Sequence, residues 1–478
     1  MLIRTRRALA ATLVAATAVG LAVGVAPAQA VPAQPDATSV AGATDIADRL
    51  RAIPGLTVVS ESATPPAGYR FLLLAYTQPV DHRKPGGPSF QQRFQLLHRD
   101  VDRPMILHTT GYHMPANPFR SEPTRLVDGN QISVEQRFFS PSRPDPADWD
   151  DLDIWQAATD HHRIVAALRP LYPAKWISTG ASKGGMTSVY HRRFYPDDVN
   201  GVVAYVAPQD RVNPFDHAYD RFFDTVGTDA ACRARLADVQ REALRRRPEM
   251  VAKYQAAADA EGWTFTRVLG SIDRAYEMTV LDTVWAFWQY STQADCATVP
   301  AATATSDELY AFIDSVAGFA FYSDSGILPY APYYYQAATQ LGWPQPRFEH
   351  LRGLTRYPGL YQANSSLPPE LRGHHDARPM LDVDVWVRSR SERMLFVYGA
   401  NDPWGAEQFT PSRRDSATYT APGANHGANI TALDPADRAA ATAMLRRWAG
   451  TDTAAPTLTA QEITALDEAE PRGTRRTR

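Results

Sequence analysis

The stretch Lys175-Trp-Ile-Ser-Thr-Gly-Ala-Ser182-Lys-Gly184 decides the fold of this chain. Its first half is a short strand-like run, and a helix is expected from Gly184 to Tyr195. The central Gly180-Ala-Ser-Lys-Gly184 fits the pattern G-x-S-x-G, in which a strand turns abruptly into a helix and lifts a Ser hydroxyl above the sheet. The helix N-terminus behind the Ser stabilises developing negative charge. This context predicts that Ser182 is a nucleophile rather than an inert Ser in a tight turn.

Strand and helix patterns alternate on both sides of this elbow. Tyr69–Tyr76 and Phe90–His98 predict an antiparallel hairpin across a turn rich in Pro and Gly. Further strands are expected at 104–112, 131–139, 199–207 and 393–400, and helices at 149–168 and 435–450. Strands that alternate with helices imply a parallel sheet flanked by helices.

The order of the partner residues is the next test of the elbow. In the α/β-hydrolase fold the nucleophile is followed along the chain by an acid and then by a His. Asp402 follows a predicted strand, and His426 lies in a Gly-bounded loop before the last helix. Asp402 would fix the tautomer of His426, which would take the Ser182 proton. Asn401 and Asp415 are weaker alternatives for the orienting residue. We therefore predict the α/β-hydrolase fold, with Ser182, Asp402 and His426 as its triad.

An oxyanion hole requires two hydrogen-bond donors near the nucleophile. One is expected from the backbone N–H of Lys183, directly after Ser182. The second is expected from the loop after the strand Met105–His108, so from Gly111 or Tyr112. Glu135, in another predicted strand, has two interpretations: it faces the site, or it forms a structural ion pair.

The pattern changes between 210 and 380, where the sequence is helical in character and rich in aromatic residues. This segment predicts a helical cap inserted into the core. The expected organisation is a signal peptide over 1–30, a linker or pro-segment over 31–60, the first part of the core over 61–209, the cap over 210–380, the second part of the core over 381–450 and a polar tail over 451–478.

The first thirty residues have the layout of a secretory signal peptide. Arg4, Arg6 and Arg7 precede the uncharged stretch Ala8–Val25, and Ala28-Gln-Ala30 forms a small-x-small cleavage site. The alternative, an N-terminal membrane anchor, fits less well because the run is rich in Ala and a cleavage site follows at once. We therefore expect a secreted, extracellular protein.

The two cysteines, Cys232 and Cys296, are expected to form a disulfide, since export favours the bridge over two buried thiols. Two cysteines exclude a thiolate metal cluster, no HExxH motif is present, and no metal or cofactor is expected. The net charge of −3 gives no reason to expect nucleic acid, and no later stretch reaches the ~20 apolar residues of a membrane span.

Several motifs together resemble a known family of secreted peptidases. They are Gly180–Thr187, Pro79–His82 with Phe90–Arg93, Val134–Phe139 and Gly399–Trp404. In these motifs the chain is similar to the secreted prolyl tri/tetrapeptidyl aminopeptidases of Streptomyces and relatives, serine peptidases related to the Pro-Xaa carboxypeptidase and dipeptidyl-peptidase family. Gln136 replaces the His that is usual in the wider clan, and this fits the aminopeptidase branch better.

The resemblance spans about 69–450, and what it implies is specific. It implies an α/β-hydrolase core with a helical cap, removal of tripeptides, often ending in Pro, from free N-termini, and catalytic roles for Ser182, Asp402 and His426. A secreted esterase or lipase and a non-catalytic binding protein of the same fold are the alternatives. A large aromatic insertion with scattered acids is unlike a short apolar lipase lid and favours peptides.

An exopeptidase needs a closed cleft and a group that receives the substrate's ammonium. Besides Glu135, candidate acids lie in the cap: Glu277, Asp282, Asp314 and Asp324. Candidates for an apolar pocket for Pro are Trp285, Trp288 and Tyr333–Tyr335; the alternative is that these side chains form the core of the cap. The expected partners are peptides with free N-termini, and the protein is expected to be a monomer.

Overall fold

The computed structural model describes residues 45–210, 216–451 and 467. The predicted signal peptide and nearly all of the predicted tail lie outside these ranges. The described core is a nine-stranded sheet in the order β1-β2-β3-β5-β4-β6-β7-β8-β9. The strands are β1 (Leu56–Glu61), β2 (Arg70–Pro79), β3 (Ser89–His98), β4 (Met105–Thr109), β5 (Asn130–Val134), β6 (Trp176–Ala181), β7 (Gly201–Tyr205), β8 (Met394–Gly399) and β9 (Ala417–Ala421).

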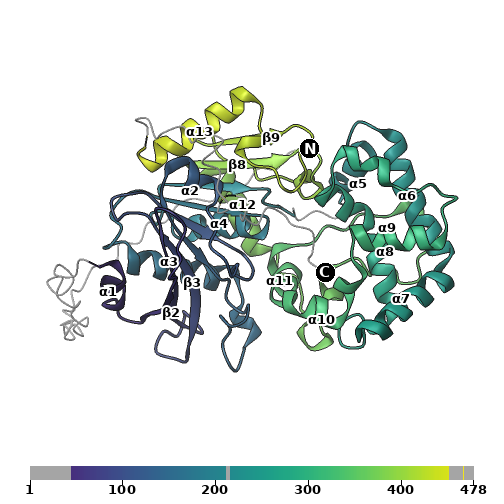
Figure 1. Ribbon diagram of the computed structural model, residues 1–478, viewed down its shortest axis with the longest axis horizontal. Helices are drawn as coiled ribbons and strands as arrows, with labels where there is room; N and C mark the ends of the chain where they lie inside the picture. Colours follow the sequence, from purple (N-terminus) through teal and green to yellow (C-terminus); the bar gives the residue numbers. More distant parts are fainter. Residues whose placement is uncertain (1–44, 211–215, 452–466, 468–478) are drawn as a thin grey trace, which may run out of the picture. The chain divides into compact units, whose positions relative to one another are not determined.

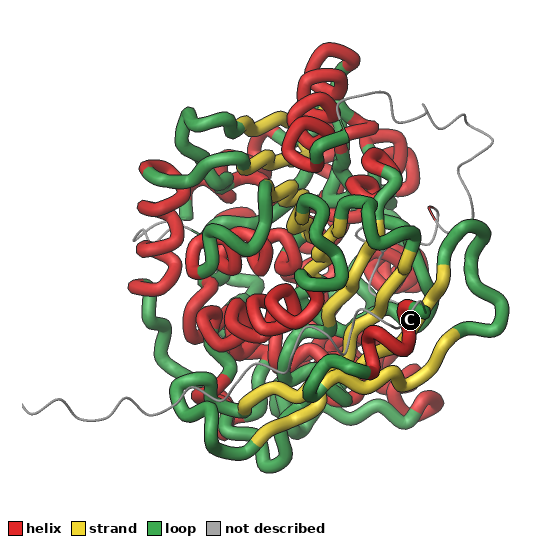
Figure 2. The backbone as a smooth tube through the Cα atoms, turned by 90° about the vertical axis from the view of Figure 1, so that its left-hand side faces the viewer, coloured by secondary structure: helices red, strands yellow, loops and turns green. Residues whose placement is uncertain are grey.

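The sheet has an antiparallel and a parallel half. Strands β1, β2, β3 and β5 pair antiparallel in that order, whereas β5, β4, β6, β7, β8 and β9 pair parallel. The predicted hairpin is confirmed as β2 and β3, in a register that pairs Leu72 with Leu96 and Leu74 with Phe94. All four of these side chains are fully buried. The strands follow one another in a single twisted sheet (Figure 2).

Helices cover both faces of the sheet. On one face, α4 (Lys183–Phe194) contacts β6 and β7, with α3 (Ile154–Leu168) and α12 (Arg378–Ser389) packed beside it. On the other face, α13 (Pro435–Ala449) contacts β6, β7 and α2 (Glu122–Val127). Figure 1 shows α13 and α2 together on the far side of the strands from α3. A mostly parallel sheet between two helical layers, with a Ser at the turn from β6 into α4, is the α/β-hydrolase fold, as the sequence predicts.

Local sequence signals explain where the core helices begin and end. Helix α3 starts at Asp153, whose side chain accepts a hydrogen bond of 2.7 Å from the backbone N–H of Gln156. Helix α13 begins with Pro435. A Pro is tolerated at this position because the first N–H groups of a helix have no acceptor within it, and the helix ends at Gly450, whose φ is 71°. Both ends of α13 agree with the predicted 435–450, whereas α3 begins later than the predicted 149, because Trp149–Asp151 forms a separate 3-10 turn.

The chain between residue 216 and α12 forms a cap with its own apolar core. Its helices are α5 (His217–Thr225), α6 (Ala230–Arg245), α7 (Arg247–Glu261), α8 (Ile272–Tyr290), α9 (Ser306–Val316), α10 (Asp324–Ile327) and α11 (Ala331–Gln336). Helix α8 lies at its centre, in contact with α6, α7 and α9, and these helices lie together in Figure 1. Shorter helical turns connect them: η3 (Gln293–Thr298), η4 (Phe319–Tyr322), η5 (Leu328–Tyr330), η6 (Ala337–Leu341), η7 (Glu349–Leu351), η8 (Ala363–Ser366) and η9 (Pro369–Leu371).

Two expectations about the core need correction. Residues 45–60, grouped above with a linker or pro-segment, are folded: α1 (Ile46–Arg51) packs on β1, and β1 is the edge strand beside β2. The segment is short and lacks strict alternation, so its strand was missed. The strand expected over 131–139 ends at Val134, because the charged side chains of Glu135 and Arg137 are engaged in buried ion pairs after the chain leaves the sheet.

The predicted disulfide is confirmed. Cys232 on α6 and Cys296 in η3 are bonded, with 5.5 Å between their Cα atoms and a sequence separation of 64. The bridge therefore closes a long loop within the cap and ties α6 to the turn that follows α8.

Removal of this bridge is expected to destabilise the cap. In the chain-entropy model, closure of a loop of this length contributes roughly 4 kcal/mol. The variants Cys232→Ala, Cys296→Ala and the double variant should each lose about that amount of unfolding free energy in urea titrations, because one bridge is lost in all three. Losses that add in the double variant would show that the cysteines act as separate buried side chains.

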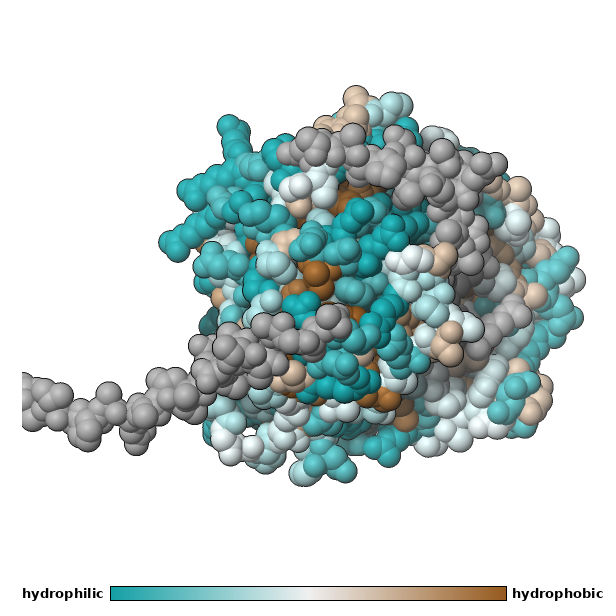
Figure 3. Space-filling model, turned by 60° about the vertical axis from the view of Figure 1, so that its left-hand side comes forward, coloured by the Kyte–Doolittle hydropathy of each residue, from teal (hydrophilic) through white to brown (hydrophobic). Residues whose placement is uncertain are grey.

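The described surface exposes few large apolar side chains. Large apolar side chains that are clearly exposed are few: Val59, Leu381 and Val385. The face shown in Figure 3 is mostly hydrophilic, with small separate hydrophobic areas. Among the described residues, no helix has the length and apolar character that crossing a bilayer requires.

Candidate active site

Ser182 occupies the sharp turn between β6 and α4. Its backbone lies at φ 56° and ψ −128°, a conformation that residues other than Gly rarely adopt. Its N–H donates to the carbonyl of Tyr205 on the neighbouring strand β7 at 3.0 Å, which holds the turn. Gly180 and Gly184 face each other so closely that a Cβ on either would collide with backbone. The two glycines of the motif are thus required by packing, as the elbow interpretation predicts.

Asp402 and His426 meet at the carboxyl ends of β8 and β9. Asp402 is fully buried and begins the turn η10 (Pro403–Ala406); its Oδ1 accepts from the backbone N–H of Trp404 at 3.1 Å. Its Oδ2 lies 2.7 Å from Nδ1 of His426. Nε2 of His426 is buried and has no hydrogen-bond partner within the described residues. This geometry leaves Nε2 as the ring nitrogen available for proton transfer.

The two weaker alternatives for the orienting residue have other partners. Asn401 donates from Nδ2 to the carbonyl of Gly423 at 3.3 Å. Asp415 accepts from Nε1 of Trp448 at 2.8 Å and is paired with Arg447. Neither contacts His426, so the geometry favours Asp402.

The cap supports the loop that carries His426. The backbone N–H of His426 donates to the carbonyl of Gln289, near the end of α8, at 3.1 Å. Nδ2 of Asn425 donates to the carbonyl of Ser291 at 3.0 Å. The position of the His therefore depends on the cap as well as on the core.

The loop after β4 brings Tyr112 to the nucleophile, but not in the way that the sequence suggests. The backbone N–H of Tyr112 is engaged locally with Oγ1 of Thr110 at 3.3 Å, whereas the side-chain hydroxyl is close enough to Ser182 for that residue to affect its pKa. Burial raises the pKa of Tyr112 well above its usual value, and the interaction with Ser182 offsets this only in part, so the hydroxyl keeps its proton at neutral pH. Sequence alone gives no signal for this side-chain contact.

Gly111 and Lys183 hold this loop against the start of α4. Gly111 has φ 74°, and a Cβ there would collide with the backbone of Lys183 and Gly184. Nζ of Lys183 donates to the carbonyl of Gly111 at 2.7 Å. Burial lowers the pKa of Lys183 to about 7. The Lys183 side chain thus fixes the loop, while its backbone N–H lies in the first turn of the helix, where it has no carbonyl partner in the helix.

Glu135 is occupied by structural partners. The residue is fully buried, and its carboxylate accepts from Arg93 at 2.8 and 3.1 Å and from the hydroxyl of Ser142 at 2.6 Å. The backbone N–H of Met114 adds a contact of 3.3 Å. These contacts favour the ion-pair interpretation over a role in substrate binding.

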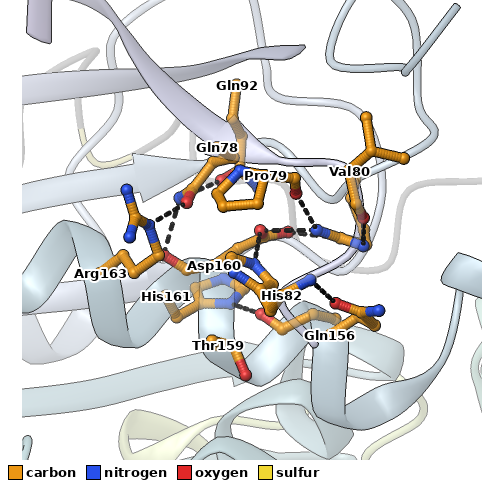
Figure 4. A network of polar contacts seen from close by, with 12 residues as sticks. Gln78, Pro79, Val80, His82, Gln92, Gln156, Thr159, Asp160, His161 and Arg163 are labelled. Carbon is orange, nitrogen blue, oxygen red and sulfur yellow. Dashed lines mark hydrogen bonds and ion pairs between the residues drawn. The ribbon is translucent and has the colours of Figure 1, made fainter. Parts of the chain in front are cut away.

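A second buried ion pair stands behind the Tyr112 loop. Arg137 and Asp160 are both fully buried and form a double contact of 2.6 and 2.9 Å; His82 adds a contact of 2.7 Å to the same carboxylate (Figure 4). The chain just before Arg137 holds the loop directly, because the N–H of Gln136 donates to the carbonyl of Tyr112 at 3.0 Å. The motifs around His82 and Arg137 therefore build a scaffold for the site.

Loss of this scaffold is expected to destabilise the fold. Burial opposes ionisation of Asp160, but Arg137 and His82 outweigh it and hold its pKa below the usual value. Asp160→Asn leaves the Arg137 charge buried without its counter-charge, and such changes cost about 3–5 kcal/mol. Denaturant titration at pH 7 should show this loss. Since the folded pKa is lowered, the contribution of Asp160 in the native protein is present above the unfolded carboxyl pKa of ~4 and disappears as the pH falls through the folded value. A loss below 1 kcal/mol at pH 7 would contradict this account.

A cavity lies between the elbow and the cap. The core contributes Ser182, Lys183, Met186, Pro208, Asp210 and Trp404, and the cap contributes Tyr219, Tyr333, Ala337, Leu341, Gly342 and Pro344. The cavity thus gives the nucleophile a confined space with aromatic and apolar walls.

The predicted substrate-binding aromatics lie mostly behind this cavity. Trp285 is buried and packs on Trp404, with 4.9 Å between ring centroids, so it supports a residue of the lining. Trp288 is buried beside Phe287 and is not part of the lining. Tyr333 lines the cavity, and its ring centroid is 5.3 Å from that of Tyr112. For Trp288, the position in the core of the cap matches the alternative given above.

The four predicted acids of the cap have local partners and do not line the cavity. Glu277 is paired with Arg247, Asp282 accepts from the hydroxyl of Tyr361, Asp314 accepts from the N–H of Phe319, and Asp324 accepts from the N–H of Val268. Asp210, which the sequence analysis did not single out, is the acid among the lining residues.

Comparisons with known proteins identify the family of this chain. Residues 39–470 match the family model described as PS-10 peptidase S37. A prolyl tri/tetrapeptidyl aminopeptidase from Streptomyces mobaraensis is 53% identical over 451 residues, which cover 93% of this chain and 92% of that protein. Among solved structures, the proline iminopeptidase of Mycobacterium smegmatis aligns with 13% identity over 79% of this chain and 100% of its own, with a TM-score of 0.35. Esterase E22 aligns with 11% identity over 79% of this chain and 100% of its own, with a TM-score of 0.37.

The match over nearly the whole chain places the elbow, the loop of Asp402 and the loop of His426 within one family. The chain belongs to the S37 family of serine peptidases.

Proposed function

We propose that this protein is a secreted exopeptidase that releases tripeptides, preferably with Pro before the cleaved bond, from free N-termini. The observation that carries the catalytic part is the contact of 2.7 Å between Asp402 and His426, on the sheet edge that also presents Ser182 at its elbow. The relative that is 53% identical bears the name prolyl tri/tetrapeptidyl aminopeptidase, and this supports the substrate class. The disulfide supports an oxidising, extracellular setting.

The proposed mechanism proceeds through an acyl-enzyme. Nε2 of His426 removes the proton from Ser182 as its Oγ attacks the scissile carbonyl, and Asp402 stabilises the imidazolium that forms. The imidazolium then gives its proton to the leaving amine, and the C–N bond breaks. Water, activated by the same His, attacks the acyl-enzyme and releases the tripeptide with a free carboxylate.

The oxyanion would be stabilised by two donors of different kinds. One is the backbone N–H of Lys183 at the start of α4, where the helix dipole also favours negative charge. The other is the hydroxyl of Tyr112, which interacts with Ser182 and keeps its proton. A side-chain hydroxyl thus takes the place that the sequence analysis gave to a backbone N–H of Gly111 or Tyr112.

Tyr112→Phe is therefore expected to lower kcat by about 10²–10³-fold, with a smaller effect on KM, because the lost donor acts mainly in the transition state. Steady-state kinetics on Ala-Ala-Pro p-nitroanilide measures this. Tyr335→Phe is the matched control, since its hydroxyl contacts Asp150, 3.4 Å away at the surface. A Tyr112→Phe enzyme with kcat within threefold of the wild type would exclude the hydroxyl as a donor.

A panel of three reagents tests the proposed class of reaction. The pure protein should react with a fluorophosphonate probe, hydrolyse Ala-Ala-Pro p-nitroanilide and leave a long-chain ester largely intact. Preference for the ester would replace the proposal by an esterase, and failure to react with the probe would replace it by a non-catalytic protein.

A further inference from the structure

Asp210 lines the cavity between core and cap that also contains the nucleophile. It follows β7, the strand next to the one that ends in Ser182, and both residues line the same cavity. The residue is partly exposed, yet its Oδ1 is out of contact with solvent and has no hydrogen-bond partner among the described residues. A buried carboxylate oxygen without a partner costs free energy, so it calls for a ligand.

The surroundings of this carboxyl lack a compensating cation. The backbone N–H of Trp343 and the hydroxyl of Tyr219 favour its ionised form, but burial and the nearby carboxylates Asp216 and Glu407 oppose it and raise the pKa of Asp210 to about 8. Within the described ranges, no Lys, Arg or His forms an ion pair with Asp210. Lys183, the cation in the lining, is committed to the carbonyl of Gly111. A ligand that brings a positive charge would therefore supply what the site lacks.

The backbone of the cap makes room for this carboxyl. Gly342 has φ 89°, and a Cβ at this position would collide with Oδ2 of Asp210. The backbone at Gly342 can therefore lie close to the carboxyl because Gly has no side chain, and Gly adopts a positive φ without strain. Around it, Tyr219, Tyr333, Leu341 and Pro344 give the cavity apolar and aromatic walls. The result is one acid at the edge of an otherwise apolar space that opens onto Ser182.

We propose that Asp210 receives the α-ammonium of the peptide's free N-terminus and thereby sets the distance from that terminus to the cleaved bond. This inference rests on the proposed exopeptidase function and adds the residue that reads the amine. An extended tripeptide spans at most about 10 Å, so this role requires the carboxyl of Asp210 and the nucleophile to lie about that far apart along the bound peptide. The apolar walls would contact the side chains between the two ends. The ammonium donates to the carboxylate, and the pair is stronger in a confined, poorly hydrated site than in water.

The test compares two substrates on two enzymes. The substrates are Ala-Ala-Pro p-nitroanilide and propionyl-Ala-Pro p-nitroanilide, which differ only in the amino group, so that charge is separated from bulk. The enzymes are the wild type and Asp210→Asn, whose side chain keeps the shape and an oxygen acceptor for the N–H of Trp343. The quantity measured is kcat/KM for all four combinations.

The wild type should prefer the substrate with the amine by at least tenfold. Asp210→Asn should lose at least tenfold on that substrate, should change less than threefold on the propionyl substrate, and should have a preference near one. A wild type without any preference would overturn the exopeptidase proposal itself. A wild type with the preference, together with an Asp210→Asn enzyme that keeps it, would overturn the role of Asp210 and leave the proposed function standing.

A matched control separates contact from long-range charge. Asp216→Asn removes the same charge from a neighbouring carboxylate that is not part of the lining and that accepts from the N–H of Gln345 at 2.6 Å. This variant should keep the preference for the amine within threefold. If both variants lost the preference, the proposed contact between Asp210 and the ammonium would be wrong, and the combined negative charge of the neighbouring carboxylates would explain the preference instead. Equal rates of Ser182 labelling by a fluorophosphonate in all three proteins verify that the elbow is intact.

Discussion

Ser182→Ala is expected to remove nearly all turnover, with kcat on Ala-Ala-Pro p-nitroanilide lowered by about 10⁴–10⁶-fold. The attacking oxygen is lost, so no acyl-enzyme forms, and what remains is the contribution of the oxyanion donors and of substrate binding. The variant should also fail to react with a fluorophosphonate probe, whereas the wild type is labelled on this residue.

The fold should survive this change. Ser182 holds the elbow through its backbone, whose N–H donates to Tyr205, and the side-chain oxygen is not part of that bond. Thermal unfolding and circular dichroism of Ser182→Ala should therefore match the wild type within a few degrees. If the purified, folded variant still turned over substrate within tenfold of the wild-type rate, another residue would have to be the nucleophile.

Asp402→Asn is expected to lower kcat by about 10⁴-fold. Oδ1 of Asp402 accepts from the N–H of Trp404, which directs the opposite atom of the side chain at Nδ1 of His426. In the variant this atom is an amide nitrogen, which can only donate. Nδ1 must then accept, the proton of the ring moves to Nε2, and the His can no longer take the proton of Ser182.

The chain offers a matched control for this change. Asp415→Asn alters the other candidate acid, which is paired with Arg447 and Trp448 away from His426. Its kcat should stay within threefold of the wild type, while Asp402→Asn loses most activity with little change in unfolding temperature. If the two variants had the reverse effects, the orienting residue would be misassigned.

The parts of the site that the sequence predicted are those set by local order. The elbow depends on five consecutive residues, Gly180 to Gly184, between a strand and a helix, and this pattern identified it, although the close contacts that require Gly184 come from the backbone of Thr109 and Thr110. Asp402 and His426 each follow a strand in the expected order, and the parallel pairing of β7, β8 and β9 brings the ends of these strands to one edge. Strand order along the chain was therefore enough to bring the partners together.

The parts that the sequence did not predict depend on contacts between distant segments. Tyr112 was expected to act through its backbone, and the interaction of its hydroxyl with Ser182 had no signal in the sequence, because the loop is held by Lys183 at Gly111 and by Gln136 at Tyr112. Asp210 was missed because its neighbours in the cavity, Tyr219 and Gly342, come from the cap. Among several acids in this part of the chain, only packing distinguishes the one that lines the cavity from those that do not.

Two sequence patterns found a structural explanation rather than a catalytic one. Glu135 is paired with Arg93, and Asp160 with Arg137 and His82. These contacts hold together the chain segments that support the Tyr112 loop. Buried charges with complete sets of partners are poor candidates for substrate contact, because their hydrogen-bonding capacity is already used.

The central claim is that this serine peptidase counts from a free N-terminus, and one measurement tests it most directly. A peptide that begins Ala-Ala-Pro and continues for several residues is digested in its free and its N-acetylated form, and the first products are identified by mass spectrometry. The account predicts that the free peptide loses Ala-Ala-Pro as its first product and that the acetylated peptide is cut at least tenfold more slowly, which corresponds to about 1.4 kcal/mol of transition-state binding. Equal cleavage of both forms, or first cuts at internal bonds, would contradict it.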